Sequence, residues 1–328
     1  MQKVTREVLL AKAKELLQSN TVDSVLAWGK GEFSYDVTPT VFLNVNDLEE
    51  NFVFGDFCGS NLSKYLVKEI PKTESKILVF LKPCDTYSFN LLLTEHRIER
   101  EKVYVVGIPC EGMLSPNKIR QSVESFTNAE MNGEKVNIYT LFNGAVELDA
   151  IKCLPDRCIN CKSKRHVAYD ELLGDEGEVL SNNRFDEVER IERMTPDERF
   201  AFWQNELSRC IRCNACRDVC PACTCEKCVF DNTDSGLENK APSDSFEEKM
   251  FHIIRAFHVS GRCTDCGECS RVCPQQIPLH LLNRKIIKDI NNFYGEYQAG
   301  ETVKSRAPIV DFKLEDPEAA DVVKGEND

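Results

Sequence analysis

The sequence lacks several features that would place it in common classes of protein. No stretch approaches the roughly 18 consecutive apolar residues that a membrane-spanning helix requires. Residues 1–17 mix charged and apolar side chains and contain no uninterrupted apolar segment of an export signal. With 54 acidic and 41 basic residues the formal net charge is −13, which opposes binding to nucleic acid. We therefore expect a cytoplasmic protein with no membrane span and no nucleic-acid partner.

Short motifs of common catalytic and nucleotide-binding sites are also missing. The chain contains no Gly-x-Gly-x-x-Gly, Walker A, His-Glu-x-x-His or Gly-x-Ser-x-Gly segment, and its five histidines form no metal-binding pattern. No flavin fingerprint occurs either, although many flavin sites carry no short motif. The sequence therefore indicates no catalytic residue.

Cysteine is the residue type that the chain has in excess, with 17 copies. Three precede residue 150 and the other 14 follow it. In a reducing compartment, clustered cysteines are metal ligands more often than disulfides. The distribution predicts an amino-terminal domain at residues 1–175, a cysteine-rich domain at residues 190–298 and an acidic tail at residues 299–328.

Hydrophobic patterns predict an α/β fold for the amino-terminal domain. Residues 76–83 include a short apolar run typical of a buried strand, and residues 103–108 form a second one. Between them Asp85 is a suitable N-cap for a helix that continues to about Glu95. A strand–helix–strand unit with a short crossover has parallel strands, so we expect a partly parallel sheet.

The second domain is predicted to be helical. Thr195 and Glu198 have the spacing of a capping box that opens a helix. Two further amphipathic helices are predicted, one from Ser245 towards Gly261 and one from Pro278 to Gly295. The apolar stripes that we expect to pack in the core are Phe200, Trp203 and Leu207 on the first helix, Phe246, Met250, Ile253, Ile254 and Phe257 on the second, and Leu281, Leu282, Ile286, Ile290 and Phe293 on the third.

Two motifs in this domain have the spacing Cys-x2-Cys-x2-Cys-x3-Cys-Pro, which is typical of proteins with two 4Fe–4S clusters. In this spacing three thiolates bind one cubane and the fourth binds the other. The predicted ligands of cluster 1 are Cys210, Cys213, Cys216 and Cys273. The predicted ligands of cluster 2 are Cys263, Cys266, Cys269 and Cys220. Structural zinc is the alternative, but zinc sites typically use two separated pairs.

The segment between the two motifs is long. Cys220 and Cys263 are separated by 42 residues that include a complete amphipathic helix. We therefore expect an α-helical dicluster ferredoxin domain, in which packed helices hold the clusters.

Four other cysteines predict a third 4Fe–4S cluster. Cys84 follows the first strand of the strand–helix–strand unit and Cys110 follows the second, so both are expected at the carboxyl edge of the sheet. Cys158 and Cys161 supply two more thiols. The alternatives are structural zinc and free buried thiols, because this set has no diagnostic spacing.

The remaining cysteines are not assigned by their spacing. Three of them follow the first motif directly: Cys223, Cys225 and Cys228. The candidates for a fourth ligand beside them are Cys58, Cys153, a histidine such as His252, or a partner chain. A fourth cluster, a zinc site and free thiols are all open. The reserve ligands for the third site are Cys153 and Cys58.

Several segments resemble one family. Residues 209–228, RCIRCNACRDVCPACTCEKC, and residues 251–278, FHIIRAFHVSGRCTDCGECSRVCPQQIP, resemble the iron–sulfur β subunits of methanogen-type formate dehydrogenases. Related proteins are the iron–sulfur subunits of deazaflavin-reducing hydrogenase, sulfhydrogenase and anaerobic sulfite reductase. KPCD at Lys82–Asp85 and CINC…YDELLGD within residues 158–175 resemble the same group. The resemblance extends from about residue 50 to residue 295.

The resemblance implies an electron-transfer subunit of an anaerobic oxidoreductase complex of formate dehydrogenase or hydrogenase type, in some cases linked to heterodisulfide-reductase-like modules. The implied partners are a catalytic redox subunit and a second electron-transfer or flavin subunit. The leading hypothesis is a relay of single electrons without bond chemistry on a substrate. The alternative is an FAD-containing subunit that exchanges hydride with a soluble deazaflavin or nicotinamide carrier. A zinc-stapled scaffold is a third hypothesis.

Overall fold

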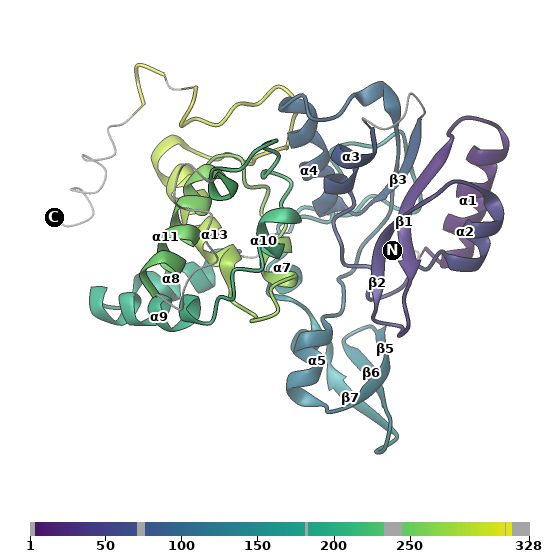
Figure 1. The fold of residues 1–328 in the computed structure, drawn as a ribbon, viewed down its shortest axis with the longest axis horizontal. Coiled ribbons are helices and arrows are strands. Elements are labelled where there is room, and N and C mark those ends of the chain that lie inside the picture. The colour runs from purple at the N-terminus through teal and green to yellow at the C-terminus, as the bar shows by residue number, and fades with distance from the viewer. Residues whose placement is uncertain (1–3, 71–75, 181–182, 233–244, 312, 317–328) are drawn as a thin grey trace. The chain divides into compact units, whose positions relative to one another are not determined.

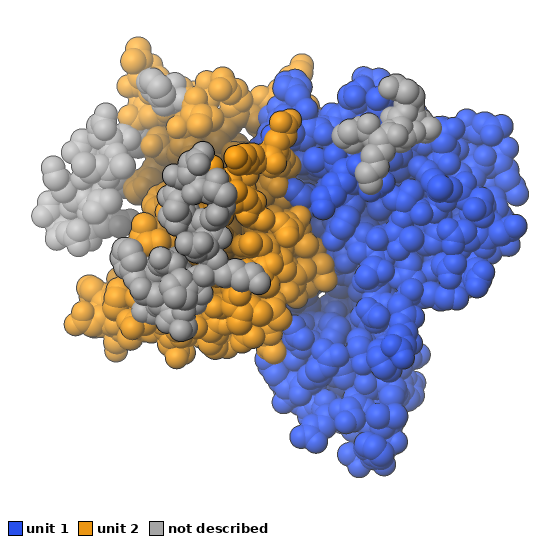
Figure 2. All heavy atoms as spheres, viewed as in Figure 1, with its two compact units in different colours: residues 1–182 blue, residues 183–328 orange. Residues whose placement is uncertain are grey.

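The structure is a computed structural model that describes residues 4–70, 76–180, 183–232, 245–311 and 313–316. The chain divides into two compact units, residues 1–182 and residues 183–328 (Figure 2). Each unit has apolar cores of its own. None of the helices in the described part of the chain combines the length and apolar character that crossing a bilayer requires.

Unit 1 is built on a five-stranded sheet with the strand order β2-β1-β3-β4-β8. β1 is antiparallel to β2, whereas the β1–β3, β3–β4 and β4–β8 pairs are parallel. The predicted α/β class with a partly parallel sheet is therefore confirmed. The strands are β1 Ser24–Lys30, β2 Val37–Phe42, β3 Ile77–Leu81, β4 Val103–Gly107 and β8 Glu171–Leu172.

Helices cover both faces of this sheet. α1 and α2 lie on one side, and α3 and α4 lie on the other (Figure 1). This cover explains why every residue of β3 is buried, as is typical of a central parallel strand. The helices of unit 1 are α1 Arg6–Gln18, α2 Val45–Asn51, α3 Ser63–Glu69, α4 Pro83–Thr94, α5 Pro116–Ser122, α6 Ala150–Cys153 and α7 Asp156–Ile159, with a 3-10 helix η2 at Arg100–Lys102.

The junction between β3 and α4 differs from the prediction in one respect. Asp85 is not the N-cap of α4, because Lys82 occupies that position and Pro83 begins the helix. Proline is favoured there since its missing N–H needs no partner in the first turn. Asp85 lies within the first turn, and its carboxylate pairs with the Lys82 ammonium at 2.7 Å. Both side chains are buried, so the ion pair joins the end of β3 to the start of α4.

A smaller antiparallel sheet is inserted between β4 and β8. Its strand order is β5-β6-β7. With α5 and α6 it encloses a second apolar core that includes Ile119, Val136 and Ile138. The strands are β5 Phe126–Asn132, β6 Lys135–Thr140 and β7 Ala145–Asp149.

The described part of unit 2 is mainly helical, as predicted. α9 begins at the expected capping box, in which Thr195 and Glu198 each accept a backbone N–H from the other. The last helix of the unit ends at Gly295, whose φ of 87° favours glycine. The helices are α8 Asp186–Glu192, α9 Pro196–Ser208, α10 Ala215–Asp218, α11 Ser245–His258, α12 Glu268–Arg271 and α13 Leu279–Tyr294, with a 3-10 helix η3 at Val229–Asp231.

The apolar stripes of α9 and α11 pack inward only in part, since Leu207 is buried and Trp203 and Ile254 pack against the core of unit 2. Four of the predicted core residues are exposed: Phe200, Met250, Ile253 and Phe257. The buried face of α11 instead includes Phe251, His252 and Arg255. Spacing alone places part of this stripe on the wrong side because the inner face of α11 carries polar as well as apolar side chains.

The predicted acidic tail is described only in part. Residues 299–311 and 313–316 are described, and this part includes the buried Ala299 and Ala307. Residues 317–328 lie outside the described residues.

The burial of β3 gives a test of the fold. We expect Leu78→Ala to lower the free energy of unfolding by about 2–5 kcal/mol, because it removes buried methyl groups and leaves a cavity. Leu141→Ala is the matched control, since Leu141 is 64% exposed and its truncation should change stability by no more than about 0.5 kcal/mol. Urea unfolding of the full chain, followed by far-UV circular dichroism, measures both. Equal effects would contradict the central position of β3.

Candidate metal centres

The two ferredoxin-type motifs fold into loops with the same backbone conformation. Arg212 and Asn214 have φ values of 52° and 61° in the first loop, and Asp265 and Gly267 have φ values of 58° and 65° in the second. These residues occupy matching positions on either side of the second cysteine of each motif. Alternation of left-handed and ordinary residues turns successive N–H groups towards one point, which forms an anion-binding nest. The repeat in sequence is therefore a repeat in structure.

A one-turn helix follows each loop. α10 contains Cys216 and precedes Cys220, and α12 contains Cys269 and precedes Cys273. Both helices begin at a left-handed N-cap. The third and fourth cysteines of each motif are therefore presented in the same way.

The cysteines predicted for cluster 1 line one cavity in unit 2. The residues around it include Cys210, Cys213, Cys216 and Cys273. Burial and then the neighbouring thiols, Cys210 and Cys273 among them, raise the pKa of Cys216 to about 12. Cys273 comes from the second motif, so the cavity combines residues of both motifs.

The cysteines predicted for cluster 2 also lie close together. Burial is the largest cause of the raised pKa values of Cys263, Cys266 and Cys269, and the charge of Cys220 adds to each. Cys220, the last cysteine of the first motif, is therefore next to the first three cysteines of the second. The described residues contain no group of three or more His, Cys, Asp or Glu side chains arranged around a single metal ion.

Arg255 of α11 is a buried cation that faces both sets. Its side chain is 3% exposed, and Nη2 donates to the Cys216 carbonyl at 2.9 Å. Burial alone would lower the pKa of Arg255, but the charges of Cys220, Cys269 and Cys216 raise it. Arg255 lies within the insert and belongs to no motif, so nothing in the sequence singles it out.

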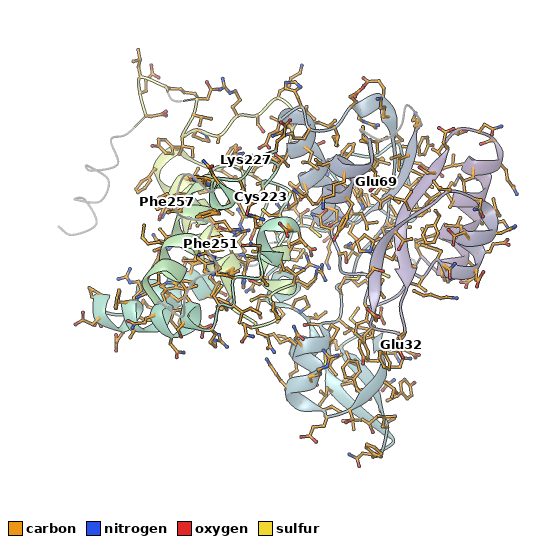
Figure 3. The ribbon with its side chains drawn as sticks, in the orientation of Figure 1. Glu32, Glu69, Cys223, Lys227, Phe251 and Phe257 are labelled. Carbon is orange, nitrogen blue, oxygen red and sulfur yellow. The ribbon has the colours of Figure 1, made fainter. Side chains whose placement is uncertain are left out.

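His252 lies one turn before Arg255 on the buried face of α11. It is 2% exposed and lines the cavity that contains Cys210 and Cys216. Neither ring nitrogen has a hydrogen-bond partner among the described residues. Burial, and then Arg255 and Arg212, lower the pKa of His252 to about 3. The adjacent Phe251, labelled in Figure 3, packs under the Arg212 guanidinium at 4.1 Å from the ring centre.

Three of the cysteines predicted for cluster 3 meet at the sheet edge of unit 1. β3 and β4 are parallel and end at the same level, with Leu81 opposite Gly107. Burial and then the charge of Asp85 raise the pKa of Cys84, and the charge of Cys110 adds to them. Burial and then the charge of Cys158 raise the pKa of Cys110 to about 11. Cys84 and Cys110 each follow the end of their strand by three residues, at the same edge of the sheet, as expected from the parallel strands.

Cys161 is the fourth cysteine of this predicted set. It follows α7 by two residues, and its thiol donates to the Ser163 carbonyl at 3.2 Å. Cys158 lies within α7 and Cys161 lies two residues after its end, so one short helix and its C-terminal turn carry both cysteines.

Two buried cations lie beside this edge. Lys82 donates to the Ser60 carbonyl at 2.9 Å, and Arg157 donates to the Gly59 carbonyl at 2.6 Å. Both charges oppose the effect of burial on the pKa of Cys84. Arg157 directly precedes Cys158, and this adjacency is the sequence signal that would have pointed to it.

Cys58 and Cys153, the predicted reserve ligands, lie in apolar cores. Cys58 belongs to the core of the main sheet and accepts the Gly55 N–H at 3.3 Å. Cys153 is buried in the core of the smaller sheet.

The three cysteines after the first motif have different surroundings. The charge of Cys223 acts on Arg255, Cys225 is exposed, and Cys228 packs against the core of unit 2.

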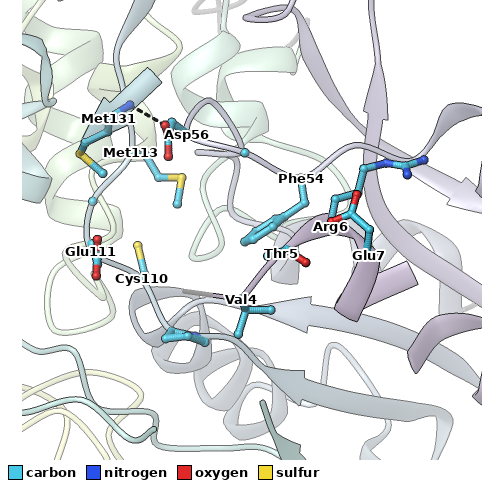
Figure 4. Close-up of a pocket in the computed structure, with 13 residues that line it drawn as sticks. Val4, Thr5, Arg6, Glu7, Phe54, Asp56, Cys110, Glu111, Met113 and Met131 are labelled. Atoms are coloured by element: carbon cyan, nitrogen blue, oxygen red, sulfur yellow. Dashed lines mark hydrogen bonds between the residues drawn. The ribbon is translucent and has the colours of Figure 1, made fainter. Parts of the chain in front are cut away.

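A separate cavity of about 330 Å³ in unit 1 reaches Cys110 (Figure 4). The Arg6 guanidinium, at its rim, donates to the backbone carbonyls of Phe52 and Glu49. Its apolar side chains are Val4, Phe54, Met113 and Met131. Its acidic side chains are Glu7, Asp56 and Glu111.

Comparisons with known proteins agree with this geometry. Residues 206–277 match the 4Fe–4S dicluster domain. The F420-dependent formate dehydrogenase subunit beta of Methanocaldococcus jannaschii is 26% identical over 340 residues, which cover 86% of this chain and 88% of that protein. The F420-dependent formate dehydrogenase 1 subunit beta of Methanococcus maripaludis is 25% identical over 359 residues, which cover 90% of each.

A solved structure is also similar to this chain. A chain of the F420-reducing NiFe hydrogenase complex from Methanosarcina barkeri is 14% identical, with a TM-score of 0.40, over 64% of this chain and 88% of its own length. The sequence relatives and the domain match confirm the resemblance that the motifs predict. This chain is an iron–sulfur protein with a 4Fe–4S dicluster domain, and it is a relative of formate dehydrogenase β subunits.

Proposed function

We propose that the chain is an electron-transfer subunit of an oxidoreductase complex of formate dehydrogenase or hydrogenase type, and that it binds three 4Fe–4S clusters. The observation that carries this proposal is the pair of matched cysteine loops within residues 206–277. The length of the match to formate dehydrogenase β subunits supports it, since it covers both units of the chain. The clusters, when bound, accept and donate single electrons.

For clusters 1 and 2 the donor sets fit the cofactor. Each set offers four thiols beside an anion-binding loop, and thiolates are the usual ligands of 4Fe–4S clusters. Arg255 offsets part of the negative charge that two such sites would bury. The proposed ligands of cluster 1 are Cys210, Cys213, Cys216 and Cys273. The proposed ligands of cluster 2 are Cys263, Cys266, Cys269 and Cys220.

For cluster 3 the proposed ligands are Cys84, Cys110, Cys158 and Cys161. The mutual influence of the first three thiols supports this set. The buried cation Arg157 supports it as well, because an anionic group in a buried site is stabilised only when opposite charge lies near it, whereas the nearby Lys82 is already paired with Asp85. Cys58 and Cys153 serve as packing residues in this proposal.

The partners follow from the relatives. F420-dependent formate dehydrogenase β subunits belong by name to an enzyme that acts on formate. We infer that this chain exchanges electrons with two partner subunits. One is a catalytic redox subunit, and the other is a second electron-transfer or flavin subunit. The negative net charge favours contact surfaces on these partners that carry basic side chains.

The second candidate function is that of an FAD-containing subunit that exchanges hydride with a soluble carrier. The cavity that reaches Cys110 favours it, because its apolar side chains suit a flat ring beside a redox centre. The described charges that line this cavity oppose binding of the FAD diphosphate. Among the described residues, the lining contains three carboxylates and one arginine, and the Nε and Nη2 of that arginine already donate to backbone carbonyls. Bound flavin at about one per chain would support this candidate over a pure relay.

Metal content tests the number of clusters. We expect about twelve irons and about twelve sulfides in each chain purified without oxygen, at four of each per cubane, and no stoichiometric zinc. About sixteen irons would instead assign a fourth cluster to the group Cys223, Cys225 and Cys228. One zinc beside twelve irons would make that group a zinc site, and zinc without sulfide would contradict the relay altogether.

Double variants test the crossed ligand sets. We expect Cys220→Ser and Cys263→Ser each to lose about four irons, and the double variant to lose the same four, because both residues serve cluster 2. Cys220→Ser combined with Cys210→Ser should lose about eight, because cluster 1 is then lost as well. The opposite pattern would assign each motif its own cluster.

A single variant tests cluster 3. Cys84→Ser should lower the iron content by about four, because it removes a proposed ligand. Cys153→Ala is the control, since its thiol lies in an apolar core, and it should leave the iron content unchanged. The measurement is iron per chain after anaerobic purification and gel filtration. Unchanged iron in Cys84→Ser would remove this cysteine from the ligand set.

A further inference from the structure

His252 is a polar side chain that the proposed ligand sets do not use. It is 2% exposed, and neither ring nitrogen has a hydrogen-bond partner in the described part of the chain. Buried polar groups in folded proteins nearly always have a partner, because water is lost on burial and must be replaced. The position of His252 therefore points to an acceptor that the described residues do not supply in this structure.

The surroundings of the ring indicate which acceptor this is. His252 lines the cavity that also contains Cys210, Cys213, Cys216 and Cys273. The charged groups that act on it, Arg255 and Arg212, are cations and cannot accept a hydrogen bond. Imidazole carries at least one N–H in every protonation state found in proteins. A group rich in sulfur acceptors in this cavity would supply the missing partner.

We propose that His252 donates a ring N–H to a sulfur atom of cluster 1 and thereby raises the reduction potential of that cluster above the value set by its thiolates alone. This inference rests on the proposed function, because it requires a cluster in the cavity. A hydrogen bond to sulfur stabilises the reduced form, which carries more negative charge than the oxidised form. His252 is a positioning and tuning residue and is not a ligand.

Two side chains of α11, Arg255 and His252, differ in which of the two proposed clusters they influence. Arg255 acts on cysteines of both sets, so its charge shifts both potentials in the same direction. His252 lines the cavity of cluster 1. The hydrogen bond therefore raises the potential of cluster 1 relative to that of cluster 2.

The experiment is a redox titration of the full-length protein followed by electron paramagnetic resonance. The signal of cluster 1 is identified by its loss in Cys210→Ser. We expect His252→Leu to make the reduced form of cluster 1 about tenfold less stable, a shift of about 59 mV to lower potential, with cluster 2 unchanged. His252→Gln keeps an N–H donor and should recover part of the shift. An unshifted potential in His252→Leu would overturn the proposal.

His258→Leu is the matched control. His258 lies on the same helix but is exposed, so its replacement should leave both potentials unchanged. An equal shift in this variant would show a general effect on α11 and would overturn the proposal.

A second measurement avoids the risk that His252→Leu misfolds. Protein labelled with 15N-histidine should show weak nitrogen coupling to reduced cluster 1 in pulsed resonance spectra, and His252→Gln should abolish this coupling. Strong coupling, together with the loss of about four irons in His252→Gln, would make His252 a ligand and would overturn the proposal.

Failure of the proposed function is distinguishable from failure of this inference. If Cys210→Ser keeps its full iron content, the ligand set of cluster 1 is wrong and both fall. If Cys210→Ser loses about four irons while His252→Leu shifts no potential, only the inference on His252 falls.

Discussion

The two cysteine loops of unit 2 depend on a backbone that changes hand on either side of the second cysteine. This conformation costs about 1–2 kcal/mol at each position without glycine. Glycine occupies one position, Gly267, and the other three are Arg212, Asn214 and Asp265. The neighbouring helices hold two of these residues in place. Arg284 of α13 pairs with Asp265 at 2.7 Å, and Phe251 of α11 packs against Arg212. The left-handed conformation of these loops therefore depends on packing against α11 and α13.

Charge is the second constraint on both units. Thiols that become ligands are anionic, and a buried anion is stable only when cations or N–H groups compensate it. Unit 1 provides Arg157 and the Lys82–Asp85 ion pair beside its sheet edge, and unit 2 provides Arg255, on which cysteines of both sets act. A protein with a net charge of −13 thus places three of its cations inside, where they act on thiols. We regard these buried cations, in a protein whose net charge is negative, as the feature that links the fold to electron transfer.

The agreement between sequence and structure varies with the range of the interactions. The capping box at Thr195 follows the prediction, because it involves residues three apart in one helical turn. The N-cap of α4 does not, since Lys82 takes that position and Asp85 is drawn into a buried ion pair. The face of α11 is also different, because His252 and Arg255 turn towards the cysteines and leave Phe257 exposed. Hydrophobic spacing does not reveal which polar side chains share the inner face of a helix with apolar ones.

The sequence by itself determined the two ferredoxin-type motifs, the strand–helix–strand unit and hence the position of Cys84 near Cys110. These features depend on short spacings and on the direction of parallel strands, which local chemistry controls. Only the tertiary structure decided which side chains of the insert face the cysteines, because His252 and Arg255 reach them through the packing of α11. The same holds for Cys58 and Cys153, whose burial in separate cores depends on contacts between segments distant in sequence.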